Sequence, residues 1–199
     1  MEEALPQSGR RRTSDSGPAE QPTGPQSTLQ LISGGRDRVA RLWDILTGNN
    51  IRVLATSPAD TIYAVDISPD GSVVASAGAD KAIRLWNPET GVLRRQLDGH
   101  TAAVSALTFS PDGTLLASGG RDKTLILWRA RFGKEMRRLD LGAHGAVNGL
   151  AFTPDSKMIA SCGRDTVVRT WRVKTGRLVR EYVGHDGAVR PPFRSPYCL

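Results

Sequence analysis

Hydrophobic and polar residues alternate over short stretches along most of the chain, and Gly, Pro, Asp and Asn interrupt each stretch. This period of two is typical of β-strands with one buried face, whereas an amphipathic helix repeats every three to four residues. The clearest unit predicts strands at residues 103–109, 114–118, 124–128 and about 135–140. Its first turn contains Pro-Asp-Gly, and these are residue types that a tight turn needs.

The same unit recurs along the chain. Residues 61–97 and 146–182 repeat all four strands, while the first unit has strands at 29–33, 39–43 and 51–55 but no predicted inner strand before them. A tryptophan ends the third strand of every unit, at intervals of 42 or 43 residues: Trp43, Trp86, Trp128 and Trp171. A fixed period of about 40 to 45 residues with several short strands is typical of propeller blades.

Two short motifs give the repeat a family resemblance. The pairs Gly99-His100, Gly184-His185 and Trp43-Asp44 resemble the G-H and W-D marks of the WD40 repeat family. Other repeats depart from these marks, as the family tolerates, at Ala143, Asn87, Arg129 and Arg172. The resemblance covers about residues 29–190. It implies an all-β fold of WD40-type β-propeller blades, with three full four-stranded blades and one partial blade, and therefore an incomplete propeller.

The chain divides by composition. Residues 1–27 are rich in Pro, Gly, Ser and Gln with few large apolar side chains, so we expect a disordered tail. The repeat domain is expected at 28–190, with a partial first blade at 28–56, blades at about 57–99, 100–143 and 144–184, and the start of a further repeat at 185–190. Residues 191–199 contain three prolines, which do not suit a paired inner strand, and are expected to be a non-repeat tail.

The partial first blade leaves the closure of the ring open. We expect an open arc that needs a partner chain to cover its blade edges, because exposed apolar faces and unpaired strand edges recruit other chains. In the alternative, residues 186–190 supply the missing inner strand of the first blade and close a ring of one or two chains. His185 would then join Ser33, Asp37 and Trp43.

Composition and charge restrict the class of protein. The chain has 199 residues, 39% of them apolar, and a formal net charge of +7. It begins with acidic residues, unlike a signal peptide, and no apolar run is long enough to span a membrane. Cys162 and Cys198 are too few for a disulfide framework or a four-ligand metal site. We therefore expect a cytoplasmic or nuclear protein.

Each repeat carries a Ser and an Asp at a fixed distance from its Trp, and two repeats add a His. These are the residue types of a hydrolytic triad, but an enzyme needs one such site and here the set recurs. The resemblance implies instead a buried hydrogen-bond chain that holds the turns to the third strand. The sets are His100, Ser118, Asp122 and Trp128; His144, Ser161, Asp165 and Trp171; Ser76, Asp80 and Trp86; and Ser33, Asp37 and Trp43. Pro58 stands where the second set needs its His, so that set is expected to be broken.

No nucleotide-binding loop, nucleophile elbow or metal-ligand spacing is present in the sequence. We therefore expect no catalytic activity, no cofactor and no metal. With the family resemblance, this indicates a non-catalytic protein–protein interaction scaffold or adaptor without a small-molecule substrate or a membrane partner. Two alternatives stay open: a basic nucleic-acid-associated WD40 protein, and a truncated isoform or fragment without function.

The residue before each turn Asp suggests how a partner binds. It is Arg36, Ala79, Arg121 and Arg164 in the four repeats. The resemblance implies that this position lies on the top face, near the central channel, where partners dock. Repeated arginines suit the bidentate capture of carboxylate or phosphate, so the sequence predicts an acidic or phosphorylated peptide partner. The alternative is that arginine simply suits an exposed turn.

Two further basic segments allow only less specific predictions. The run from Arg129 to Arg138 has only Phe132 as an aromatic neighbour, so we expect a solvated basic edge and not a nucleic-acid stacking surface. In the tail, Arg11 and Arg12 precede Thr13 and Ser14, which resembles a site for a basophilic kinase. Phosphorylation of Ser14 would place a strongly acidic group beside these arginines.

Overall fold

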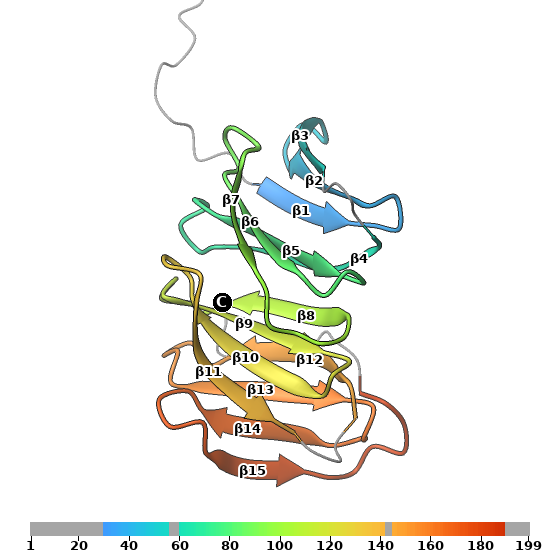
Figure 1. Cartoon of the computed structure of the whole chain (residues 1–199), viewed down its shortest axis with the longest axis vertical. Coiled ribbons are helices and arrows are strands. Elements are labelled where there is room, and N and C mark those ends of the chain that lie inside the picture. Colours follow the sequence, from blue (N-terminus) through green and yellow to red (C-terminus); the bar gives the residue numbers. More distant parts are fainter. Residues whose placement is uncertain (1–29, 56–59, 142–144, 190–199) are drawn as a thin grey trace, which may run out of the picture.

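The structure, a computed structural model, describes residues 30–55, 60–141 and 145–189. These residues form four antiparallel sheets (Figure 1). The strands are β1 (Gln30–Gly34), β2 (Val39–Asp44), β3 (Asn50–Ala55), β4 (Ile62–Ile67), β5 (Val74–Gly78), β6 (Ile83–Trp86), β7 (Leu93–Leu97), β8 (Val104–Phe109), β9 (Leu115–Gly120), β10 (Thr124–Arg129), β11 (Lys134–Asp140), β12 (Val147–Phe152), β13 (Met158–Gly163), β14 (Val168–Arg172) and β15 (Leu178–Tyr182). The predicted all-β fold is confirmed.

Each sheet is one blade, and its strands follow one another in sequence order. The first blade has three strands, β1 to β3, and the other three blades have four. The strands of the third blade lie within two residues of the predicted bounds. For the described residues, three full blades and one partial blade are therefore confirmed.

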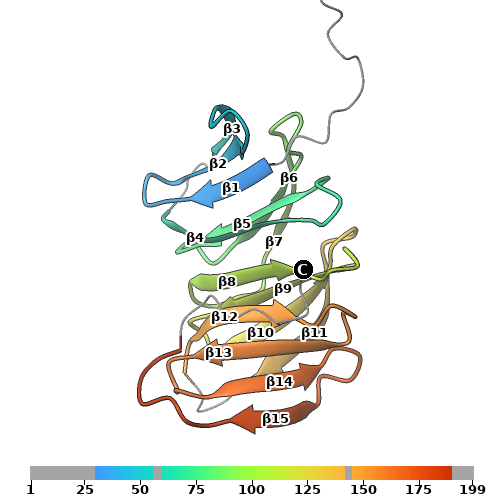
Figure 2. The same cartoon turned by 180° about the vertical axis from the view of Figure 1, so that it is seen from behind.

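The blades stand side by side in an arc, with β1–β3 at one end and β12–β15 at the other (Figures 1 and 2). The inner strands β4, β8 and β12 are neighbours, since β4 contacts β8 and β8 contacts β12, and β1 of the first blade contacts β4. A separate apolar core fills each of the three interfaces between blades. All six residues of β9 are buried, since this strand lies between two neighbouring blades. Each large side chain buried there contributes about 1.5–3 kcal/mol.

A recurring contact joins the outer part of each blade to the next. The turn between the third and fourth strands contains a glycine with positive φ, and an arginine of the preceding blade lies against it. The three pairs are Arg52 and Gly91, Arg95 and Gly133, and Arg137 and Gly176; a Cβ on these glycines would lie 2.8, 3.0 and 2.6 Å from the arginine Cδ. We call this contact the arginine–glycine latch. The positive φ favours glycine at this position, and the latch adds a second constraint, since any side chain there would displace the arginine.

The C-terminal part of the described chain returns to the fourth blade. The backbone N–H of Val189 donates to the carbonyl of Gly163 at 2.9 Å, and Asn148 Nδ2 donates to the carbonyl of Val189 at 3.3 Å. The first bond is equivalent to that from Ile62 N to Gly35 O, which begins the second blade beside the first. Among the described residues the sheet of the first blade contains only β1, β2 and β3, so the alternative in which residues 186–190 complete that blade within one chain is wrong. Segment 186–189 lies at the other end of the arc, where a further repeat would begin.

Candidate functional site

The polar set of the third blade is a continuous hydrogen-bond chain. Trp128 Nε1 donates to Ser118 Oγ at 2.8 Å, and His100 Nε2 lies 2.8 Å from the same oxygen. His100 Nδ1 lies 2.8 Å from Asp122 Oδ2, which also accepts the backbone N–H of Thr101. Ser118 is fully buried, so no substrate can reach its hydroxyl. The set therefore joins strands and turns and offers no nucleophile.

The pKa shifts of His100 and Asp122 indicate which atoms of this hydrogen-bond chain carry the protons. Burial lowers the pKa of His100 more than the neighbouring carboxylate of Asp122 raises it. Burial raises the pKa of Asp122, but the hydrogen bond from the Thr101 N–H, the nearby His100 and the hydrogen bond from Thr124 together outweigh it, and the net shift is downward. At neutral pH the imidazole is uncharged and donates its Nδ1–H to an ionised carboxylate. The Ser118 hydroxyl then donates to Nε2 and accepts from the indole, so every member has a partner.

The other three blades keep the Trp–Ser bond but pair the turn Asp differently. The indoles of Trp43, Trp86 and Trp171 donate to Ser33, Ser76 and Ser161 at 2.8, 2.9 and 2.8 Å. The turn Asp forms an ion pair with the arginine four residues later, in the pairs Asp37–Arg41, Asp80–Arg84 and Asp165–Arg169. The second set was expected to be broken for lack of a His, and Asp80 there is paired with Arg84 instead. His144 and Ser14 lie outside the described residues.

The sequence analysis did not predict these arginines as members of the polar sets. The third blade has Ile126 at the position that Arg41, Arg84 and Arg169 occupy in the others. The sequence shows the pairing as a repeated Asp-x-x-x-Arg pattern, in which an arginine follows the turn Asp by four residues. Arg169 is buried, and its Nε also donates to Glu181 Oε1 at 2.7 Å, so it links the third strand of the fourth blade to the fourth strand.

Two of the three predicted partner-binding arginines meet in one groove. Arg121 and Arg164 line a groove of about 830 Å³ beside Lys123, between the third and fourth blades. We call it the arginine groove. It opens on the face formed by the Asp turns, the Asp-turn face. Arg36 is exposed in the equivalent turn of the first blade but does not line this groove. The second blade, which has Ala79 at the equivalent position, lies between the blade of Arg36 and those of Arg121 and Arg164.

The walls of the arginine groove come from the inner strands. Tyr63, Ser105 and Asn148 line it from equivalent positions near the start of β4, β8 and β12. The guanidinium of Arg121 lies over the Tyr63 ring, 5.0 Å from its centre. Among the described residues, Arg121, Lys123 and Arg164 have no ion-pair partner. Aligning the inner strands of the repeats would have revealed these wall residues from the sequence.

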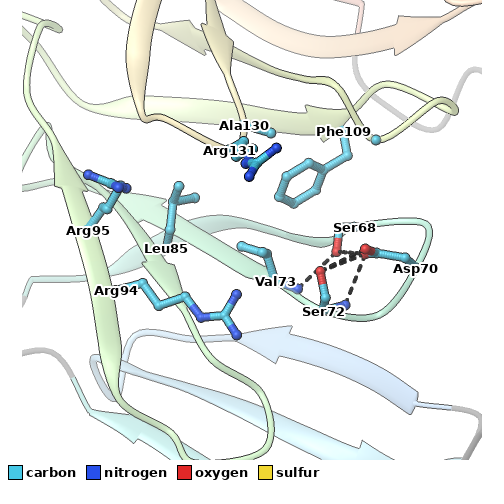
Figure 3. A pocket seen from close by; sticks show the side chains of 11 residues that line it. Ser68, Asp70, Ser72, Val73, Leu85, Arg94, Arg95, Phe109, Ala130 and Arg131 are labelled. Atoms are coloured by element: carbon cyan, nitrogen blue, oxygen red, sulfur yellow. Dashed lines mark hydrogen bonds between the residues drawn. The ribbon is translucent and has the colours of Figure 1, made fainter.

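A second cavity opens at the opposite ends of the strands, which we call the opposite face. It lies between the second and third blades, has a volume of about 300 Å³, and is drawn in Figure 3. The turn after β4 and strand β7 supply one side, and residues of the third blade supply the other. No residue of the polar sets or of the arginine groove lines it.

Comparisons with known proteins identify the repeats. The family model "WD40: WD domain, G-beta repeat" matches residues 48–87, 91–129 and 133–172, which is more than half of the chain. The chain belongs to the WD40 family. The matched repeats cover the last strand of the first blade, all of the second and third blades, and the first three strands of the fourth. The family is generally a non-catalytic scaffold for protein interactions, and this WD40 chain has the architecture of such a scaffold.

The chain is also similar to segments of curated WD-repeat and other proteins. It is 42% identical over 64 residues to WD repeat and SOCS box-containing protein 1 of Takifugu rubripes, a match over 32% of this chain and 15% of that protein. It is 33% identical over 78 residues to cilia- and flagella-associated protein 52 of Chlamydomonas reinhardtii, over 39% of this chain and 13% of the relative. These matches therefore cover about one seventh of the relatives' length.

Among the described residues, no three His, Cys, Asp or Glu side chains gather where they could hold a metal ion. The described part of the chain has no helix that is long and apolar enough to cross a membrane.

Proposed function

We propose that this WD40 scaffold binds an acidic or phosphorylated peptide segment of a partner protein in the arginine groove. The observation that supports the proposal is that Arg121 and Arg164, from successive blades, line one groove without a carboxylate partner among the described residues. Guanidinium groups bind carboxylate and phosphate through two parallel hydrogen bonds. Lys123 adds a third positive charge at the same place.

The walls of the groove suit a peptide. The Tyr63 ring holds the Arg121 guanidinium by a cation–π contact, so less freedom is lost when an anion binds. Ser105 Oγ donates to the carbonyl of Val147, and Asn148 Nδ2 donates to that of Val189. Ser105 Oγ and Asn148 Oδ1 remain as acceptor oxygens, and the N–H groups of a peptide backbone are matching donors.

The proposal is tested with a fluorescein-labelled phosphoserine peptide whose other residues are small or acidic. We expect Arg121→Ala with Arg164→Ala to weaken binding at least about tenfold, the loss typical of an interface arginine. The unfolding free energy should change by less than about 0.5 kcal/mol, because both arginines lie in exposed turns. Arg36→Ala is the matched control, and it should leave the affinity unchanged.

Two results would contradict the proposal. Peptide binding could survive the double change, in which case the groove is not the site. Alternatively, the chain could bind single-stranded oligonucleotides with a steep salt dependence while ignoring peptide sequence and phosphorylation. That outcome would favour a nucleic-acid-associated protein, because phosphate contacts dominate such binding.

A further inference from the structure

The cavity on the opposite face has an apolar floor. Val73, Leu85, Phe109 and Ala130 line it, and Leu85 and Phe109 are buried members of the core between the second and third blades. In Figure 3 the side chains of Val73, Leu85 and Phe109 lie in the central part of the group of lining residues. An apolar side chain that entered here would extend the existing core. The volume of about 300 Å³ is at the lower end of the range for ligand pockets.

The rim of this cavity is basic. Arg94, Arg95 and Arg131 line it, all three are exposed, and none has an ion-pair partner among the described residues. Arg95 is held in place because it forms the latch with Gly133. Arg131 has its guanidinium 5.6 Å from the centre of the Phe132 ring. The rim therefore presents guanidinium groups, one of them positioned by the blade interface, to whatever occupies the floor.

One carboxylate also lines the cavity, but its own turn engages it. Asp70 accepts hydrogen bonds from the hydroxyls of Ser68 and Ser72, at 2.6 Å and at 2.8 and 2.9 Å, and from the backbone N–H of Ser72 at 3.0 Å. These bonds lower the pKa of Asp70 and keep it ionised. In Figure 3 it lies on the side of the cavity away from Arg95. The charges at the rim therefore sum to a positive value.

The next blade interface repeats the arrangement. A cavity of about 400 Å³ between the third and fourth blades is lined from six equivalent positions of the repeat. The pairs are Ser72 and Thr114, Val73 and Leu115, Arg94 and Met136, Gly113 and Ser156, Ala130 and Val173, and Arg131 and Lys174. Arg129, Lys157 and Arg172 make this second rim basic as well. The basic run after Trp128 is therefore divided between the rims of two apolar cavities, and the expectation of a plain solvated edge is incomplete for Arg129 and Arg131.

The geometry points to a second partner site on the opposite face, for a peptide segment in which a large apolar side chain is flanked by carboxylates. The apolar side chain occupies the cavity between the second and third blades, and the carboxylates pair with Arg94 and Arg131. This site goes beyond the proposed function, because it lies on another face and requires an apolar anchor. A nucleic acid fits it less well, since the floor is aliphatic apart from Phe109 and offers no row of aromatic rings for base stacking.

The test uses two probes and two variants of the full chain. The first probe is a fluorescein-labelled, capped peptide Glu-Asp-Phe-Glu-Asp, and the second is the phosphoserine peptide described above. We expect Arg94→Glu with Arg131→Glu to weaken binding of the first probe at least about tenfold and to leave the second probe unaffected. The matched variant, Arg121→Glu with Arg164→Glu, makes the same change of charge on the Asp-turn face. It should weaken binding of the second probe and leave binding of the first unaffected. Failure of one site is thereby distinguished from failure of the other.

A further pair of measurements tests the apolar anchor. Replacing Phe by Ala in the first probe should weaken binding at least about tenfold, and Ala130→Leu, which fills the cavity without a change of charge, should do the same. Thermal unfolding checks that each variant folds. If the variant with Arg94→Glu and Arg131→Glu does not fold, Arg94→Gln with Arg131→Gln is used in its place. Binding that ignores the Phe, survives the changes at Arg94 and Arg131, or is displaced more strongly by a ten-nucleotide single strand than by unlabelled peptide would overturn the inference.

Discussion

At the scale of single residues, the repeat uses two different partners for the same turn carboxylate. The turn Asp must accept hydrogen bonds at the start of the third strand, and its charge needs a donor nearby. In the third blade the donor is His100, whereas Arg41, Arg84 and Arg169 supply it in the other blades. Either side chain satisfies the carboxylate, which explains why the repeat tolerates the loss of its His.

The first residue-scale prediction concerns Asp122. We expect Asp122→Ala to lower the free energy of unfolding by about 1–3 kcal/mol, because the imidazole N–H of His100 and the backbone N–H of Thr101 lose their acceptor. Urea unfolding at pH 7 measures the change. The matched control is Glu89→Ala, which removes an exposed carboxylate and should change stability by less than about 0.5 kcal/mol. Equal effects of the two substitutions would contradict a structural role for the Asp122 set.

At the scale of elements, the blades are held by apolar cores and by the arginine–glycine latch. The latch joins the fourth strand of one blade to the turn before the fourth strand of the next. Arg137 strengthens it by donating to the carbonyl of Lys174 at 3.0 Å. At the first blade, Gly48 has the same positive φ of 71°, but no atom lies within 4 Å of where its Cβ would be. Gly48 therefore lacks the contact and serves as an internal reference.

This reference allows the latch to be measured. Gly48→Ala should cost about 1–2 kcal/mol, the cost of a left-handed backbone with a Cβ. Gly133→Ala should cost that amount plus at least about 1 kcal/mol, since its Cβ would lie 2.6 Å from Leu97 Cδ2 and 3.0 Å from Arg95 Cδ. The comparison is made by thermal unfolding of both variants. If both substitutions had the same cost, the latch would contribute nothing beyond backbone conformation.

At the scale of the whole molecule, the described chain is an open arc with two exposed end blades (Figure 2). Leu31 and Ile45 of the first blade and Val179 and Tyr182 of the fourth are 55, 53, 46 and 48% exposed. Arg180 of the fourth blade occupies the position of the latch arginines, and Gly48 of the first blade that of the latch glycines. The two ends thus carry complementary halves of the contact that joins neighbouring blades.

We therefore expect the 199-residue chain to self-associate in a concentration-dependent way, because exposed apolar faces and strand edges recruit other chains. Light scattering measures the mass across a range of concentrations. Changing Val179 and Tyr182 to Lys should shift the mass toward that of a single chain. Phe132→Lys is the control, because Phe132 is 62% exposed but belongs to a middle blade. A monodisperse single chain at all concentrations would rule this expectation out.

The sequence by itself determined the strands, the turns and the division into blades. These features depend on short-range alternation and on turn residues such as Pro111 and Gly113, which act within one repeat. The period of the tryptophans then set the register of every repeat. It also identified Arg36, Arg121 and Arg164 as equivalent positions of the repeat. Equivalence does not say how far apart these side chains lie in the folded chain.

Only the tertiary structure decided which equivalent residues meet. Arg121 and Arg164 share a groove because their blades are neighbours, while the blade of Ala79 separates Arg36 from them. The apolar cavities between blades and the docking of Val189 on the fourth blade also depend on the packing of one blade against the next. Such contacts join side chains about one repeat apart. Because the same pattern recurs in every repeat, the pattern alone does not say which side chains will face one another across a blade interface.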